Sequence, residues 1–212
     1  INKYGSAVGN RLALQLVIDG MKLAPANPNF LESRDSIILA DKVDNGGANF
    51  NELWAGFAKR GMGGSASSPG SDTTSGVSEA FDLPGLAFNG AIVADQATGN
   101  GNSVIDFNEC VDLTVKLLNN GNTTASGVSA VLSTSTPGVI ILQPFATYSN
   151  VVAGATAANL QGYKIFTTPS FVCGTRIQFT LQISSSQGVR TTKFNVDTGI
   201  IGQPSRYDNF TP

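Results

Sequence analysis

The spacing of hydrophobic residues divides the chain into a helical first part and a strand-rich second part. Within residues 4–23, polar side chains recur every three or four positions at Arg11, Gln15, Asp19 and Lys22, and hydrophobic residues fill most of the rest. This pattern predicts a helix buried over most of its circumference. A second helix is predicted from Asn27-Pro28 to about residue 43, because a cap followed by Pro starts helices. Its expected buried residues are Phe30, Leu31, Ile37, Ile38 and Ala40.

A third, shorter helix is predicted over residues 49–61. Asn49 and Glu52 have the spacing of a capping box, and Gly61 can supply the left-handed residue that ends a helix. One face carries the hydrophobic side chains Leu53, Trp54, Phe57 and Ala58. Because three helices in about sixty residues bury only a modest core, we expect residues 1–62 to be the end of a larger helical domain whose remainder is absent from this chain.

Residues 63–84 are expected to form a linker. Gly, Ser, Thr and Pro dominate their first two thirds. Such a composition is typical of exposed, flexible segments that proteases cleave.

From residue 85 the hydrophobic period changes from helical to alternating. Residues 111–117 and 177–183 alternate between apolar and polar side chains, as half-buried strands do. Further short apolar runs occur at 91–94, 128–132, 139–142, 163–166 and 193–196, separated by Asn-Gly and Pro-Gly turns. We predict an antiparallel, immunoglobulin-like β-sandwich over residues 85–199 and a linker or tail over 200–212. The fold class is therefore α followed by all-β.

Composition restricts the possible functions. The 13 Lys and Arg residues are nearly balanced by 15 Asp and Glu residues without runs of either sign, which disfavours a nucleic-acid partner. The apolar runs are too short to span a membrane. Charged residues make up 13% of the chain, as in many extracellular β-rich modules. The chain has no histidine, so a Ser-His-Asp triad, a Cys-His pair and a His-Glu-x-x-His zinc helix are excluded within these residues.

Several motifs of the first part occur in the order found in a known family. They are Gly9-Asn10-Arg11 with the apolar run to Leu23, Asn27-Pro28-Asn29-Phe30, Arg34-Asp35, Gly46-Gly47-Ala48-Asn49 and Phe57-Ala58-Lys59-Arg60-Gly61. Residues 1–83 thereby resemble the last part of the catalytic domain of fungalysins, a family of secreted zinc metallopeptidases. The resemblance implies a thermolysin-like parent domain whose zinc ligands and catalytic groups lie upstream, so none is assigned here. Ala26 and Asn51 stand where many relatives have Cys, which is consistent with the loss of one disulfide. The second part more loosely resembles adhesion-like modules that follow bacterial protease domains.

Two cysteines lie at the margins of predicted strands. In a secreted protein Cys110 and Cys173 could form a disulfide that closes a loop of about sixty residues. The alternation of their strands argues in part against this, since Cys173 shares the inward register of Ile177 and Cys110 is out of step with Val111. A disulfide and two separate buried thiols both remain open.

Oxygen-bearing side chains crowd the segment before the first long strand. The candidate calcium ligands are Asp95, Asn100, Asn102, Asp106 and Glu109, with Asn108 nearby. Calcium takes six to eight oxygen ligands from such loops. The EF-hand pattern is not met, however, and Asn-Gly sequences are ordinary turn formers, so a solvated turn is the favoured alternative.

Two further patterns have structural alternatives. Asn122-Thr123-Thr124 and Asn209-Phe210-Thr211 match the N-glycosylation pattern, which matters only in a host that glycosylates. An aromatic carbohydrate platform would use Trp54, Phe145, Tyr148, Tyr163 and Phe166. Core packing is the favoured use of these aromatic residues.

Two hypotheses for function follow. The first is a non-catalytic C-terminal portion of a secreted fungalysin-like zinc metalloendopeptidase, with helices that support the peptidase domain and an accessory sandwich. Its partners would be the missing N-terminal part of that domain and, through it, a protein substrate. The second is an independent extracellular module that binds a glycan, a cell surface or a protein.

Overall fold

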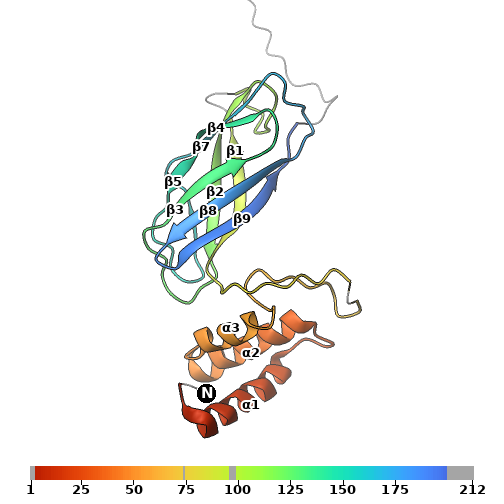
Figure 1. Cartoon of the computed structure of the whole chain (residues 1–212), viewed down its shortest axis with the longest axis vertical. Coiled ribbons are helices and arrows are strands. Elements are labelled where there is room, and N and C mark those ends of the chain that lie inside the picture. Colours follow the sequence, from red (N-terminus) through yellow and green to blue (C-terminus); the bar gives the residue numbers. More distant parts are fainter. Residues whose placement is uncertain (1–2, 74, 96–98, 200–212) are drawn as a thin grey trace, which may run out of the picture. The chain divides into compact units, whose positions relative to one another are not determined.

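The computed structural model describes residues 3–73, 75–95 and 99–199 (Figure 1). The chain forms two compact units that divide between Pro84 and Gly85. The first contains the helices and the second contains the strands. The predicted class, α followed by antiparallel β, is confirmed.

The three predicted helices are present as α1 (Gly5–Leu23), α2 (Phe30–Asn45) and α3 (Phe50–Ala58). The capping box predicted at Asn49 is wrong. It lies instead at the start of α2, where the Asn29 side chain accepts from the backbone N–H of Leu31 and Glu32 while the Glu32 carboxylate accepts from Asn29 N–H. The cap of this helix was predicted at Asn27, two residues before the observed N-cap. Asn49 instead donates from its backbone and side chain to the buried carboxylate of Asp41.

Helix α1 packs closely against α2 at Gly20. Gly9, Leu16 and Gly20 are its buried positions. A Cβ on Gly20 would lie 2.7 Å from Ile37 Cγ1 and 2.9 Å from Ile37 Cα, so the two backbones approach closely. The prediction that α1 is buried over most of its circumference is therefore not met within this unit. Phe30 was also predicted to be buried, but it begins α2 and is 71% exposed.

Helix α3 is held through Trp54, which is buried together with Ala58. The guanidinium of Arg34 on α2 lies over the Trp54 ring, with Cζ 4.5 Å from the ring centroid. Arg34 Nη1 also donates to the carbonyl oxygens of Met62 and Gly63. One buried arginine thus joins α2, α3 and the chain that leaves α3.

The segment after α3 folds back so that its two halves form hydrogen bonds with each other. Gly63 N–H donates to Ala80 O, Gly64 N–H donates to Asp82 O, and Ser67 exchanges two backbone hydrogen bonds with Ser78. The Asn27 and Asn29 side chains, near the start of α2, donate to Ser71 Oγ and Pro69 O. The described residues of the segment 63–84, which was predicted as a linker, therefore form a hydrogen-bonded hairpin within the helical unit, and we call this segment the return loop. Its flexibility and sensitivity to proteases stay predictions.

Gly63→Ala should open the return loop. An added Cβ would lie 2.5 Å from Asp82 O and 2.6 Å from Ala80 O, both of which are backbone atoms that cannot rotate away. We expect a several-fold faster cleavage within residues 65–82 in limited proteolysis followed by mass spectrometry. Ser75→Ala, at an exposed position of the same loop, is the matched control and should leave the rate unchanged. Equal rates for both variants would contradict the hydrogen-bonded loop.

The second unit consists of two antiparallel sheets. Its strands are β1 (Leu86–Ala94), β2 (Cys110–Asn119), β3 (Ser129–Thr134), β4 (Val139–Gln143), β5 (Phe145–Thr147), β6 (Thr156–Ala158), β7 (Tyr163–Thr167), β8 (Ile177–Ser185) and β9 (Gly188–Val196). One sheet has the order β1-β2-β7-β4 with β6 also paired to β2, and the other has the order β5-β3-β8-β9. The three-residue strands β5 and β6 were not predicted, because they are too short to show alternation.

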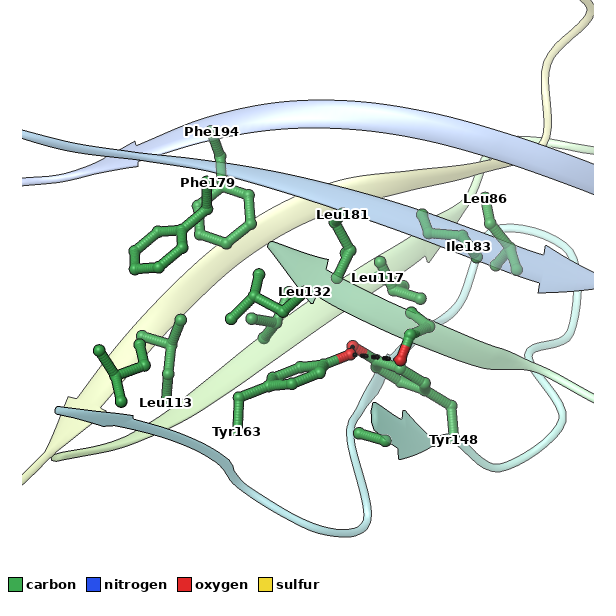
Figure 2. Packing of buried hydrophobic residues seen from close by; sticks show 14 of the residues in the cluster. Leu86, Leu113, Leu117, Leu132, Tyr148, Tyr163, Phe179, Leu181, Ile183 and Phe194 are labelled. Atoms are coloured by element: carbon green, nitrogen blue, oxygen red, sulfur yellow. Dashed lines mark hydrogen bonds between the residues drawn. The ribbon is translucent and has the colours of Figure 1, made fainter. Parts of the chain in front are cut away.

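The inward side chains of both sheets form one hydrophobic core. Val111, Leu113, Val115 and Leu117 of β2 and Ile177, Phe179, Leu181 and Ile183 of β8 are at most 1% exposed. Figure 2 shows these layers interleaved around the pair Tyr148 and Tyr163, whose hydroxyl oxygens are 3.2 Å apart. Burial raises the pKa of both phenols above the ordinary value. These tyrosines are therefore neutral core residues.

Candidate functional site

The structure brings the predicted oxygen-bearing residues together in the segment 95–109, which we call the acidic loop. Asn100 and Asn102 both donate from their side-chain amides to Asp106 Oδ2, at 2.8 Å each. Asp95 accepts from Ser103 N–H, and the carboxylate of Glu109 accepts from Asn100 N–H and Asp106 N–H. Residues 96–98 of the loop lie outside the described residues.

Two carboxylates of this loop are buried. Asp95 is fully buried and Glu109 is 6% exposed. Burial raises the pKa of Glu109, the two N–H donors lower it, and the nearby charges of Asp95 and Asp106 raise it. The loop thus concentrates negative charge while its backbone N–H groups stabilise that charge.

Thr167 at the end of β7 fixes the loop to the sheet. Its Oγ1 donates to Asp106 O and accepts from Glu109 N–H. Thr167 is fully buried. Sequence reasoning missed this residue, because it lies 58 positions after Glu109 and no spacing links the two.

The five candidate calcium ligands are neighbours, but their carboxylates are already engaged by N–H groups. Over the residues that the structure describes, no group of three His, Cys, Asp or Glu side chains has an arrangement that could hold a metal ion. Calcium binding at Asp95, Asn100, Asn102, Asp106 and Glu109 therefore stays a prediction, with a hydrogen-bonded turn as the alternative.

Thermal unfolding with and without calcium separates these two alternatives. Calcium binding would raise the melting temperature of the sandwich in millimolar calcium, since a ligand that binds the folded state stabilises it, and EDTA would reverse the rise. The hydrogen-bonded turn predicts the same melting temperature in calcium, magnesium and EDTA. Asp106→Asn is the informative variant, because it keeps an acceptor for the two amides but removes a negative charge. It should abolish the rise if calcium binds.

The two cysteines lie on either side of the same region. Cys110 begins β2 directly after Glu109, and Cys173 precedes β8 with its Sγ 4.0 Å from Asp106 Oδ1. Both side chains are half-buried, and the structure holds them as thiols. A disulfide between them stays a prediction, to be checked by intact mass after alkylation without reducing agent.

The other predicted site residues are dispersed. Asn122 is exposed in the turn after β2, and Asn209 lies outside the described residues. The proposed aromatic platform is not formed, because Trp54, Tyr148 and Tyr163 are buried. Phe145 and Phe166 belong to strands of different sheets.

Helix α1 carries an exposed apolar face that sequence reasoning anticipated as a buried one. Leu14, Val17, Ile18 and Met21 follow helical spacing and are 66%, 42%, 51% and 73% exposed. The opposite side of the helix already packs on α2. We call these four residues the outer face of α1. None of the described helices has the length and apolar character needed to cross a bilayer.

Comparison with known families identifies the helical part. The family model of the fungalysin metallopeptidases (M36) matches residues 2–66. This match covers α1, α2 and α3 together with the start of the return loop. Residues 2–66 are therefore a fungalysin-family segment, as their motifs predicted.

Curated relatives agree with this assignment. An extracellular metalloproteinase of Pyrenophora tritici-repentis is 47% identical over 89 residues, which cover 42% of this chain and 13% of that protein. The extracellular metalloproteinase MEP of Pyricularia oryzae is 60% identical over 58 residues, or 27% of this chain and 9% of the relative. The chain thus spans about a tenth of the length of these relatives. Their names confirm the predicted extracellular location.

One solved structure shows a slight similarity to the chain. The cupredoxin domain of amoB from Nitrosocaldus yellowstonii is 12% identical, with a TM-score of 0.23, and the comparison covers 48% of this chain and 65% of that one. No assignment rests on this likeness.

Proposed function

We propose that the chain is the non-catalytic C-terminal portion of a secreted, fungalysin-like zinc metalloendopeptidase. In this proposal the first unit completes a thermolysin-like peptidase domain whose catalytic residues and zinc ligands lie upstream. The zinc belongs to that parent domain, since this chain has no histidine. Protein substrates would reach the parent enzyme and not a site in these residues.

The observation that carries the proposal is the outer face of α1. A helix in a finished domain has one apolar face towards its core, whereas α1 has a packed face at Gly9, Leu16 and Gly20 and a second apolar face exposed. The family match begins at the helical end of the chain and is confined to it. A partner that belongs to the same peptidase domain accounts for both facts, because its helices would cover Leu14, Val17, Ile18 and Met21.

For the second unit we propose an immunoglobulin-like accessory sandwich. Its two antiparallel sheets enclose one core, and Tyr148, directly after β5 of one sheet, pairs with Tyr163 at the start of β7 in the other. Residues 85–199 would then form the module and 1–84, return loop included, would belong to the peptidase part. This boundary revises the predicted division at residue 62.

The first test is the association state of the whole chain. An uncovered apolar face favours self-association, so sedimentation should show concentration-dependent oligomers. The double variant Leu14→Glu, Met21→Glu should be monomeric, while Ile92→Glu, at an exposed position of β1, should behave as the unchanged chain does. A monomeric unchanged chain at high concentration would count against an uncovered interface.

The second test is complementation. The chain by itself should not cleave casein in the presence of zinc. Adding the upstream part of the Pyrenophora relative's peptidase domain should restore cleavage, and the double variant on α1 should restore much less. Cleavage by the chain in isolation, or complementation that ignores the α1 variants, would reject the proposal.

A further inference from the structure

The outer face of the sheet β5-β3-β8-β9 is composed mostly of uncharged polar side chains, with a few apolar residues and one lysine. Cross-strand pairing puts Val131, Gln182 and Thr191 in one row, with Phe145 at its β5 end. The neighbouring rows contain Ser133, Thr180 and Lys193, then Gln178 with Asn195, and Thr147, Ser129, Ser184 and Val189. Lys193 is the one charged residue in these rows, and Arg176 and Asp197 form a neutral ion pair beyond them.

The other sheet shows that this is not a general property of the sandwich surface. Its outer face has an ion pair between Lys164 and Asp112, 3.1 Å apart, and also carries Lys116. Solvated sheet faces use such charges for solubility and against edge-to-edge association. The uncharged face lacks this ordinary protection.

Three amides of this face have hydrogen-bonding capacity that no other residue of the described chain uses. Gln178 and Gln182 of β8 and Asn195 of β9 are exposed, and within the described part of the chain their side chains make no hydrogen bond. Each amide offers two donors and an acceptor. Phe145 is 47% exposed and is paired with Val131, so these two residues form a small apolar patch at the β5 edge of the sheet.

The distribution of polar, apolar and charged side chains on this face favours some classes of binding partner over others. Stable protein interfaces have an apolar centre and a polar rim. Here the inner strands β3 and β8 present Ser, Thr and Gln with Val131 as their one apolar residue, and the apolar residues Phe145 and Val189 lie on the edge strands. A nucleic acid or an anionic membrane would need more than one positive charge. An uncharged polymer rich in hydroxyl groups can form hydrogen bonds with these amides and hydroxyls and needs no charged residue on the protein.

We propose that the outer face of the sheet β5-β3-β8-β9 binds an uncharged polysaccharide, with Gln178, Gln182 and Asn195 as hydrogen-bonding residues and Phe145 as an apolar contact for a sugar ring. The inference deepens the accessory role of the sandwich and goes beyond the peptidase assignment. Either can fail without the other, because polysaccharide binding is measured on the sandwich face and complementation on α1.

The test is depletion of the full-length chain from solution by insoluble cellulose and by insoluble chitin. We expect depletion by at least one of these polymers, unchanged in 1 M NaCl, because an uncharged contact is not screened by salt. Gln178→Ala with Gln182→Ala should weaken the partition at least five-fold, and Phe145→Ala should weaken it at least two-fold. Ile92→Ala with Leu142→Ala, two exposed side chains of the other sheet, is the matched control and should bind as the unchanged chain does.

Thermal unfolding of each variant separates lost binding from lost folding, since the altered side chains are exposed and should keep the melting temperature within about 1 °C. No depletion by either polymer would overturn the proposal. So would loss of binding in high salt, or an equal loss in the control variant. Depletion by insoluble protein instead of by the polysaccharides would also overturn it and assign the face to a protein partner.

Discussion

Phe179→Ala is expected to destabilise the sandwich by about 3–5 kcal/mol, the usual cost of removing a buried phenylalanine from a core. Phe179 is fully buried on β8 and its ring lies 5.3 Å from that of Phe194 on β9. Phe194 in turn stacks on Phe88 of β1 at 4.2 Å. The cavity would therefore open beside Phe194, which Figure 2 shows next to Phe179.

Phe145→Ala is the matched control for this prediction. It removes the same side chain from an exposed position of the same sheet, so the free energy of unfolding should change by less than about 0.5 kcal/mol. Urea unfolding followed by tyrosine fluorescence measures both variants in the sandwich. Similar losses for Phe179→Ala and Phe145→Ala would mean that the core is not where the structure has it.

The sequence predicted those parts of the fold that show a periodic pattern of apolar and polar residues within one segment. The long strands β2 and β8 alternate without a break, so their inward residues could be named in advance. The short strands β5 and β6 form because longer strands offer them edges, at Val131 and Leu117 respectively. Such pairings are tertiary and leave no periodic signal over three residues.

The candidate sites show the same division. The acidic loop could be outlined because its Asn and Asp residues are close in sequence, but its attachment through Thr167 depends on the pairing of β2 with β7. The uncharged outer face of the sheet β5-β3-β8-β9 could not be predicted from the sequence, because its residues are brought together only by the register of four strands. The outer face of α1 was identified correctly as apolar, and its exposure became apparent only from the packing of α1 on α2.

Gly20→Ala is expected to destabilise the helical unit, although alanine favours helices over glycine. The added methyl would lie within 3.0 Å of Ile37 N and Cα, which are backbone atoms of α2. The helices must then separate, and overpacking of this kind costs about 1–3 kcal/mol. Small domains have few contacts with which to offset such a loss, and circular dichroism at 222 nm should show helices α1 and α2 unfolding at a lower temperature.

Gly56→Ala tests whether contact, and not helix propensity, causes this effect. Gly56 is exposed on α3, and a Cβ there would meet nothing within 4 Å. The variant should stabilise the helical unit by about 0.5–1 kcal/mol through propensity alone. The same chemical change thus has opposite effects on stability at two helical positions, because the absence of a side chain at Gly20 is what lets α1 approach α2 closely. A stabilising Gly20→Ala would show that α1 and α2 do not pack in this way.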